Sequence, residues 1–303
     1  MSFKVGRIDF INTTPVYAGA DQGRLVFPGE TVRGSPAELN ALLRTGTLQI
    51  SSISSIEFAR AWPDLLILPG ISISCTGPVR SVLLHSKVPL NELSGTVGLS
   101  NRSATAHALV RIILEDFIGA APTFVDVDMG APAIQKAVAA CRSTNTPAPR
   151  ETTAALFGHL DGLLVIGDDA LALDLHDYFP HVVDLGEFWV DRTGLPFVFG
   201  IWAVRKDFAR EHPEAVDLFR SSLLRSLGCG LREPEAAIDL ARAKTGFSAE
   251  RIRSYLERID YVFGPEHIHG LRQFFDLLKR RNEIDGAVDL EFFERQRERA
   301  GHE

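Results

Sequence analysis

The opening of the chain, KVGRIDFINTTPVYAG, constrains the fold most strongly, because a short apolar strand runs directly into a helix start. The strand is expected to end near Phe10, and a helix is expected from Thr13 onward with Pro15 in its first turn. Asn12 lies at this junction. Because α/β proteins bind ligands at the carboxyl ends of their strands, Asn12 is the first candidate for a site residue.

The composition is that of an ordinary globular chain. Of its 303 residues, 45% are hydrophobic and 23% are charged, which suffices for a core in one or two domains. No apolar run reaches the roughly 20 residues that a bilayer-spanning helix requires, so we expect no membrane role. The net charge of −7 and the dispersed Lys and Arg residues argue against a nucleic-acid partner.

The cysteines and the start of the chain point to a cytoplasmic protein. Cys75, Cys141 and Cys229 are widely spaced and odd in number, which argues against a disulfide framework. No Cys and His spacing resembles a zinc site, and no metal or organic cofactor is indicated. The first strand begins so close to Met1 that we expect no cleaved secretion signal ahead of it.

Residues 3 to 85 alternate between strand and helix patterns, which is typical of an α/β fold. The helix expected over 35–44 has the clearest ends, because Ser35, Pro36 and Glu38 form a capping sequence and Gly46 follows the last turn. Besides the first strand and helix, strands are expected near 31 and at 49–53, 65–72 and 79–85, and a helix at 54–61.

A second α/β stretch follows, and then a mainly helical C-terminal third. The Thr/Pro-rich run at 142–153 lacks periodicity and is expected to be a surface loop. Strands are expected at 96–99, 123–127, 162–166 and 197–204, with helices after Ser103 and near 131–140. C-terminal helices are expected near 207–228, 234–244, 248–258, 265–282 and 289–299.

This order predicts two lobes joined by two crossings rather than two sequential domains. The strands at 79–85 and 197–204 would carry the chain out of the first lobe and back. The first lobe is therefore expected to comprise residues 1–84 and 200–303, including the C-terminal helices, and the second lobe residues 85–199. A cleft between the lobes is the expected binding site.

The candidate site segments share one chemistry: small hydroxyl and amide side chains where a strand gives way to a loop or helix. Backbone N–H groups at helix starts can bind carboxylates without a cationic side chain, so a small organic anion is the expected ligand. The same residue types are common helix caps, and each segment alone can be purely structural. The segments are 12–14, 51–55, 76–78, 100–105 and 167–169.

Other residues have both functional and structural roles open. Asp168 can position a hydroxyl, act as an acid or base, or cap the next helix. Arg80 can pair with a carboxylate or lie on an exposed strand face. Phe197, Phe199 and Trp202 can wall a ring-binding cleft or fill the core. No nucleophile triad, Walker loop or GxGxxG turn is recognisable.

Six motifs, in order, resemble the chorismate dehydratases of the futalosine route of menaquinone biosynthesis, which have a type II periplasmic-binding-protein fold. The resemblance spans most of residues 4 to 205, and the helical tail carries little of the pattern. The motifs are GRIDFINTTPVYAG, SPAELNALLRTGTLQISSISSIEFA, LLILPGISISCTGPVRSVLLHS, SNRSATAHALVRIIL, DGLLVIGDDAL and TGLPFVFGIWAV.

The resemblance implies a reaction and a set of contacts. Such enzymes convert chorismate into 3-(1-carboxyvinyloxy)benzoate by removing the ring C4 hydroxyl and the C3 proton. Asn12 would orient the leaving hydroxyl or a carboxylate. The motifs contain no obvious His or Glu base, so the enolpyruvyl carboxylate of the substrate is the candidate proton acceptor. The implied substrate contacts are Thr13, Ser54, Ser55, Gly77, Pro78, Arg80, Ser81, Asn101, Ser103, Thr105 and Asp168.

Three other functions stay open. A solute-binding protein of the same fold would bind a small anion without turnover, although the expected lack of a secretion signal counts against it. The sister family that makes 1,4-dihydroxy-6-naphthoate shares the fold, but its Ser-Pro-rich N-terminal motif and catalytic His are not evident. A regulatory effector-binding domain would need a DNA-binding module. The C-terminal helices could pack within one chain or across a homodimer.

Overall fold

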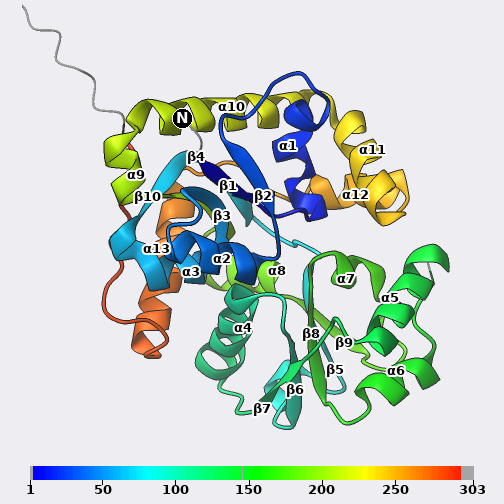
Figure 1. Ribbon diagram of the computed structural model, residues 1–303. Helices are drawn as coiled ribbons and strands as arrows, with labels where there is room; N and C mark the ends of the chain where they lie inside the picture. Colours follow the sequence, from blue (N-terminus) through cyan, green and yellow to red (C-terminus); the bar gives the residue numbers. More distant parts are fainter. Residues whose placement is uncertain (1–2, 145, 295–303) are drawn as a thin grey trace, which may run out of the picture.

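The computed structural model describes residues 3–144 and 146–294, which form two α/β lobes (Figure 1). Each lobe is built around a five-stranded sheet. The strand order is β2-β1-β3-β10-β4 in the first sheet and β7-β6-β8-β5-β9 in the second. The two-lobed α/β fold expected from the alternation of strands and helices is confirmed.

In the first sheet four strands run parallel and one, β10, runs antiparallel between β3 and β4. β10 is the strand on which the chain returns from the second lobe, so the return is held by hydrogen bonds on both of its edges. The strands are β1 (Lys4–Arg7), β2 (Glu30–Arg33), β3 (Ile50–Ser54), β4 (Leu65–Cys75) and β10 (Phe197–Arg205).

The second sheet repeats this plan, with the antiparallel strand β5 between β8 and β9. Val82, Leu83 and Leu84 already pair with β8, and Phe197 already pairs with β4. Each crossing strand pairs along its whole length within one sheet. Judged by that pairing, the chain has entered the second lobe by Val82 and has returned to the first lobe by Phe197, so both crossings fall a few residues earlier than the expected bounds at 84 and 200. The strands are β5 (Val82–Ser86), β6 (Thr96–Ser100), β7 (Thr123–Val127), β8 (Gly162–Ile166) and β9 (His181–Asp184).

The N-terminal helices begin where the sequence indicates. Ser35 Oγ accepts a hydrogen bond from the Glu38 N–H, and the Glu38 carboxylate accepts one from the Ser35 N–H, which forms the expected capping box. Gly46, at φ +76°, follows the helix end. The helices are α1 (Thr14–Asp21), α2 (Pro36–Arg44) and α3 (Ser55–Ala61), preceded by a 3₁₀ turn at Ile11–Thr13.

The C-terminal helices pack on the first lobe: α10 packs against α1, and α13 lies against β10 (Figure 1). After α12 the chain runs beside β4, where the Tyr261 carbonyl accepts a hydrogen bond from the Ser72 N–H at 3.0 Å. The helices are α9 (Lys206–Glu211), α10 (Pro213–Arg232), α11 (Pro234–Thr245), α12 (Ala249–Leu256) and α13 (Pro265–Arg280).

The surface loop expected over 142–153 is helical at both ends, over 142–144 and 150–153, so that prediction is wrong for these residues. Val138 and Cys141 bury one face of α5, and Thr153 and Phe157 bury one face of α6. This burial extends both helices into a Thr/Pro-rich segment, since tertiary packing outweighs weak local propensity. The second-lobe helices are α4 (Ala104–Arg111), continued by a π-helix (Ile112–Ile118), α5 (Pro132–Thr144), α6 (Arg150–Phe157), α7 (Gly167–Ala172) and α8 (Leu185–Thr193).

The helix expected at 289–299 is also wrong for the residues that the structure describes, and 295–299 lie outside them. Phe292 forms a parallel bridge with Ile67, and the Phe293 N–H donates to the Ile67 carbonyl at 2.8 Å. β4 is an edge strand with unpaired backbone groups. These groups favour an extended neighbour over a helix.

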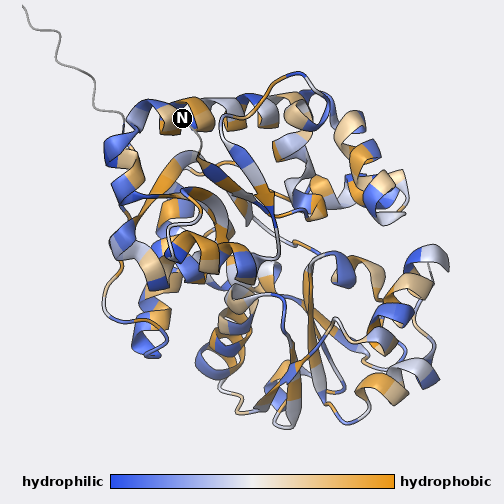
Figure 2. Cartoon of the chain, viewed as in Figure 1, coloured by the Kyte–Doolittle hydropathy of each residue, from blue (hydrophilic) through white to orange (hydrophobic). Residues whose placement is uncertain are grey.

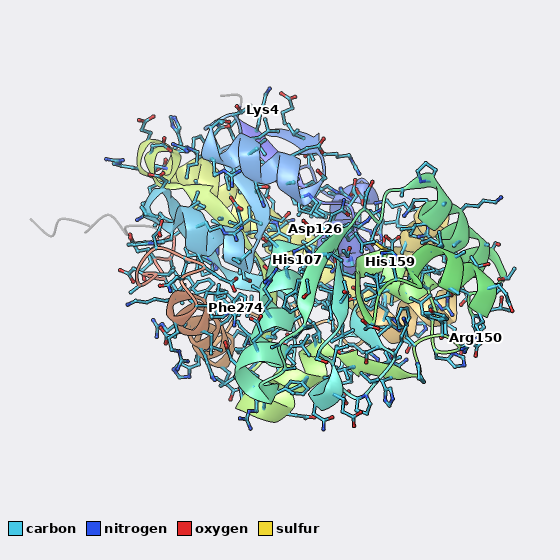
Figure 3. All side chains as sticks on the ribbon, turned by 90° about the horizontal axis from the view of Figure 1, so that it is seen from below. Lys4, His107, Asp126, Arg150, His159 and Phe274 are labelled. Atoms are coloured by element: carbon cyan, nitrogen blue, oxygen red, sulfur yellow. The ribbon has the colours of Figure 1, made fainter. Side chains whose placement is uncertain are left out.

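Apolar residues concentrate on the strands inside each lobe (Figure 2), and an aromatic cluster joins the lobes. The Trp189 ring of α8 meets the Phe197 ring of β10 at 5.1 Å between centroids and the Phe274 ring of α13 at 6.2 Å. Phe117, from the π-helix, packs on the same indole at 6.2 Å. Figure 3 shows the side chains around Phe274 from below. This cluster anchors one side of the junction between the lobes.

Two glycines of α10 allow a matched test of its packing on α1. A Cβ at Gly230 would lie 2.2 Å from the Pro15 carbonyl oxygen, whereas at Gly228 the nearest atom is the flexible Arg232 Nη1 at 3.2 Å. We expect Gly230→Ala to lower the free energy of unfolding by about 1–3 kcal/mol, through overpacking. Gly228→Ala is expected to be neutral or slightly stabilising, because Ala favours helix. Urea denaturation measures both, and equal effects would contradict the close approach.

Candidate active site

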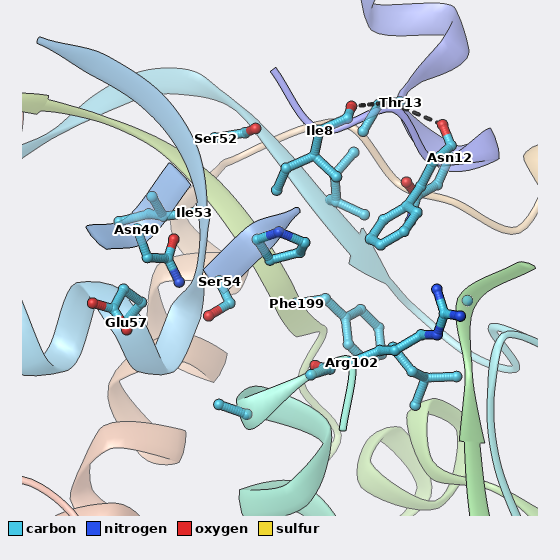
Figure 4. A pocket seen from close by; sticks show the side chains of 18 of the residues that line it. Ile8, Asn12, Thr13, Asn40, Ser52, Ile53, Ser54, Glu57, Arg102 and Phe199 are labelled. Carbon is cyan, nitrogen blue, oxygen red and sulfur yellow. Dashed lines mark hydrogen bonds between the residues drawn. The ribbon is translucent and has the colours of Figure 1, made fainter. Parts of the chain in front are cut away.

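A cavity of about 420 Å³ lies between the lobes, at the expected cleft (Figure 4). The first lobe contributes the residues that follow β1, the end of β3, one face of α2 and the middle of β10. The second lobe contributes the loop between β6 and α4 and the turn between β8 and α7. Carboxyl ends of strands from both sheets therefore meet at one space, which is where this class of sheet binds ligands.

Five helix N-termini meet at this cavity. Each brings backbone N–H groups without intrahelical partners and the positive end of a helix dipole. Ser54 precedes α3 without capping it, so its hydroxyl is free of that bond, whereas Ser103 Oγ accepts the Ala106 N–H of α4. The convergence favours an anionic ligand. The lining residues at these starts are Thr13 (α1), Pro36 and Ala37 (α2), Ser54 (α3), Ser103 and Ala104 (α4), and Ile166 and Gly167 (α7).

The charged residues in the wall are cationic on balance, although the whole chain carries −7. Arg44, Arg60 and Arg102 line the cavity together with one carboxylate, Glu57. Arg44 is paired with Glu57, and Arg102 Nε lies 3.1 Å from Asp169 Oδ2. The Arg44 and Arg102 side chains are 52% and 37% exposed, so both guanidinium groups can also reach a bound carboxylate.

Several buried polar atoms of the wall lack a protein partner. Asn12 Oδ1 and Asn40 Oδ1 are buried without a hydrogen bond, and Ser52 Oγ is a third such atom, near the Tyr17 phenol but outside hydrogen-bonding geometry. All three residues line the cavity. Since buried polar atoms are normally satisfied, these groups indicate a polar ligand or water as their partner.

Aromatic side chains give the cavity an apolar wall. Phe10, Phe199 and Trp202 line it, and the indole of Trp202 is otherwise fully buried. Phe197, considered from the sequence for the same purpose, instead fills the aromatic cluster between the lobes. The cavity thus combines flat apolar surface with polar groups, which suits a ring that carries carboxylates.

Two tyrosines from the C-terminal region form hydrogen bonds with residues of the cavity wall. The Tyr261 hydroxyl donates to the Asn12 carbonyl oxygen at 2.9 Å, and the Tyr255 hydroxyl donates to Ser81 Oγ at 3.0 Å. Burial raises the pKa of Tyr255 and the pKa of Tyr261 well above the usual range of a phenol. Both tyrosines therefore act as hydrogen-bond donors and stay neutral at physiological pH.

Of the residues singled out from the sequence, the structure brings half to the cavity wall. Asn12 and Ser81 lie close to each other there, since both contact Tyr255. Asn101 donates to the Asp128 carboxylate at 3.0 Å, which holds the β6–α4 loop. The residues on the wall are Asn12, Thr13, Ser54, Ser81, Asn101 and Ser103.

Three of the others hold the structure together. Ser55 Oγ donates to the Val198 carbonyl at 2.5 Å. Thr105 Oγ1 accepts the Ile56 N–H at 3.2 Å, and Asp168 Oδ1 accepts the Ile11 N–H at 3.4 Å. The last two bonds join the lobes on either side of the cavity, so these side chains support the site without lining it.

The remaining three lie in the first crossing between the lobes. Gly77, Pro78 and Arg80 are not among the residues that line the cavity. The Arg80 backbone N–H donates to Asp184 at 2.6 Å, and its exposed side chain reaches Ser254 Oγ at 3.5 Å. Arg80 has φ +60°, so the mid-strand position expected for it is wrong: it forms the turn before β5.

The substrate contacts implied by the resemblance leave out several wall residues, although two of them, Ser52 and Arg102, lie within the candidate segments 51–55 and 100–105. Ser52 and Ser54 are two apart on β3 and face the same side, so pairing Ser54 with Ser55 ignored strand alternation. On α2, Pro36, Asn40 and Arg44 are spaced by four and share one face. Arg60 and Arg102 carry no such signal, because their positions depend on how the lobes meet.

None of the helices in the described ranges combines the length and apolar character needed to cross a membrane. Across residues 3–144 and 146–294, no three His, Cys, Asp or Glu side chains gather in a way that could hold a metal ion. The polar side chains that line the cavity are hydroxyl, amide and guanidinium groups and the Glu57 carboxylate.

Comparison with known proteins supports the fold. The periplasmic aliphatic sulphonate binding protein of Escherichia coli matches with a TM-score of 0.63 at 16% identity, covering 95% of this chain and 90% of that one. The lobes, the two sheets of equal plan and the cavity between them thus define a periplasmic-binding-protein-like fold, as the resemblance predicts.

The sequence comparisons show the family. A family model described as menaquinone biosynthesis matches residues 3–144 and 133–280. A chorismate dehydratase of Thermus thermophilus is 31% identical over 259 residues, which cover 80% of this chain and 84% of that protein. A 1,4-dihydroxy-6-naphtoate synthase of the same organism is 25% identical over 235 residues, covering 77% and 75%. The chain belongs to this family of menaquinone-biosynthesis enzymes.

Asp168 gives the junction beside the cavity a pH dependence. Burial raises the pKa of Asp168 to about 6, from an ordinary value of 3.8. A carboxyl group whose pKa is higher in the folded than in the unfolded state makes its full contribution to the free energy of unfolding below about pH 4. This contribution is lost as the pH rises through 6. Asp168→Asn keeps the acceptor for the Ile11 N–H but cannot ionise. We expect wild type to lose stability relative to this variant between pH 4 and 6, by at most on the order of 3 kcal/mol.

Urea denaturation of both proteins at several pH values measures this difference, and groups common to both, such as the buried His85, cancel in it. A difference that is constant from pH 4 to pH 7 would show that Asp168 ionises normally in the folded state.

Proposed function

We propose that the protein dehydrates chorismate to 3-(1-carboxyvinyloxy)benzoate in menaquinone biosynthesis. The observation that carries the proposal is the convergence of five helix starts and three arginines on an aromatic-walled cavity. Chorismate is a small ring with two carboxylates, which such a cavity can hold. Membership of the menaquinone-biosynthesis family and the 31% identity to a chorismate dehydratase support the same substrate.

The reaction requires the loss of one proton and one hydroxyl group. The C3–H bond breaks, its electron pair forms the new ring double bond, and the C4 hydroxyl leaves and takes up a proton as water. The C3 position is vinylogous to the ring carboxylate, so negative charge develops on that carboxylate during proton removal. Donors that strengthen their hydrogen bonds to this charge lower the barrier. Ser54, Ser81 and Ser103 are the wall hydroxyls proposed for carboxylate binding.

Asn12 is proposed to orient the leaving hydroxyl. Its buried Oδ1 has no protein partner and its backbone is held by Tyr261, so the acceptor is free and its position is fixed. An amide oxygen that accepts the C4 hydroxyl would align the C–O bond with the ring π system. Thr13, Asn101 and Arg102 would complete the ligand contacts on either side of the cavity.

The proton acceptor is proposed to be the enolpyruvyl carboxylate of the substrate. Among the residues that the structure describes, no histidine lines the cavity, and Glu57, the one carboxylate of that lining, is engaged by Arg44. A cavity that folds the side chain over the ring would place its carboxylate next to C3. Good intramolecular geometry of this kind can supply roughly 7–11 kcal/mol of the barrier reduction.

The alternatives have weaker support. The sister enzyme is expected to use a histidine in the second lobe, and none of the described residues that line the cavity is a histidine. Its relative is also the more distant of the two, at 25% identity. The likeness to a sulphonate binding protein, at 16% identity, concerns the fold alone. The three cysteines are unpaired thiols, which fits the reducing cytoplasm that we propose as its compartment.

The test of the proposed function is incubation of the purified protein with chorismate and a chelator, with products separated by chromatography and identified by mass. We expect a product lighter by one water that absorbs as a benzoate. Asn12→Ala is expected to lower kcat by about 100-fold or more, the usual cost of losing a group that acts on the reacting atoms. Turnover that is unchanged in this variant would remove Asn12 from the mechanism.

Glu57→Gln separates substrate-assisted proton transfer from a protein base. The amide still accepts a hydrogen bond from Arg44 but cannot take a proton. If the substrate carries the base, we expect kcat to fall less than about tenfold with no change in the shape of the pH profile. A loss of 1000-fold, with disappearance of the acid limb of the profile, would instead make Glu57 the base.

A further inference from the structure

The Tyr255 phenol sits behind the cavity wall and donates its hydroxyl hydrogen to Ser81 Oγ at 3.0 Å. Both residues are buried, with 2% exposure for Tyr255 and 4% for Ser81, so bulk water does not compete for this bond. A serine hydroxyl has one hydrogen of its own and can also accept. Since Ser81 accepts from Tyr255 and lines the cavity, its own hydrogen is left for a partner on the cavity side.

Asn12 lies near the same phenol. Its Oδ1 atom is buried without a hydrogen-bond partner, and its backbone carbonyl accepts the Tyr261 hydroxyl.

We propose that Tyr255 is a positioning residue that fixes the polarity of the Ser81 hydroxyl and makes it a donor toward the substrate. The inference rests on the proposed dehydration of chorismate. A donor suits a carboxylate oxygen. Without the phenol hydroxyl, Ser81 can turn its hydrogen away from the cavity.

The C-terminal region is built to hold this phenol in place. Tyr255 lies on α12, and directly after it the Asp260 N–H donates to the Ser74 carbonyl of β4 at 2.8 Å. Asp260 also binds His267 at 2.9 Å, which ties the same segment to α13. Tyr261 then supports the Asn12 backbone from the same stretch of chain. The C-terminal region therefore reaches the site through two phenols.

The test compares Tyr255→Phe with Tyr178→Phe in steady-state turnover of chorismate. Tyr178 is a matched control, because its hydroxyl also bonds within the protein, to the Gly158 carbonyl at 3.5 Å, but does so away from the cavity. We expect Y255F to lower kcat by about tenfold or more with a smaller change in KM, because the polarity matters most as charge develops. Y178F is expected to retain wild-type kinetics.

A double variant distinguishes positioning from a general structural role. If Tyr255 acts through Ser81, then Y255F combined with Ser81→Ala loses no more kcat than Ser81→Ala alone, since the shared interaction is already gone. Independent, multiplying losses would overturn the proposal. Ser81→Cys keeps the side chain but weakens its donor, and it provides a second route should Y255F fold poorly. It is expected to reproduce the loss of kcat, and full activity in S81C would also overturn the proposal.

Different experimental results would contradict this inference and the proposed function. Wild-type turnover with an unaffected Y255F would overturn the role of Tyr255 and leave the dehydration standing. If wild type does not convert chorismate, the dehydration fails, and titration calorimetry with chorismate then decides on Tyr255. Weaker binding by Y255F than by wild type and Y178F supports the assignment of polarity, and equal binding overturns it.

Discussion

The site depends on the antiparallel insertion of β10 between β3 and β4. This strand carries the chain back from the second lobe, and its ladder with β3 pairs Trp202 with Ser52 and Gly200 with Ser54. The pairing sets the aromatic part of the cavity wall beside its hydroxyl part. Because β10 is hydrogen-bonded on both edges, the return crossing cannot shift without breaking the first sheet. The position of the second lobe, and hence of every contact that it makes with a ligand, follows from this constraint.

The polar groups of the cavity are of two kinds, neutral groups close to the lobes' cores and partly exposed arginines. Helix starts and hydroxyl groups provide polarity close to the lobes' cores, where a free cation would be costly to bury. The Arg44 and Arg102 side chains are 52% and 37% exposed, so water can solvate both guanidinium groups. This arrangement suits the small anion of the proposed function. It also leaves unpartnered acceptors, such as Asn12 Oδ1, whose desolvation only a ligand or water can offset.

The C-terminal helices have two roles in this molecule. α10 packs closely on α1, where Gly230 lets the helices approach, and so supports the helix that follows Asn12. α12 and the extended segment after it bring Tyr255 and Tyr261 under the same turn. Scaffold and site are therefore not separate parts of the chain. A residue more than two hundred positions from Asn12 in sequence bears on the same hydrogen bonds.

The sequence by itself determined the local elements and the family. Periodicity, the Ser35 capping box and six ordered motifs sufficed, because caps and alternation act over a few residues. Tertiary structure alone decided which polar groups face the cavity. Ser54 lines it while Ser55 bonds Val198, and Thr105 and Asp168 join the lobes instead of lining the wall. It also extended α5 into the Thr/Pro-rich run and brought in Tyr255. These outcomes depend on partners far away in the chain, and a local pattern carries no information about where such partners will lie.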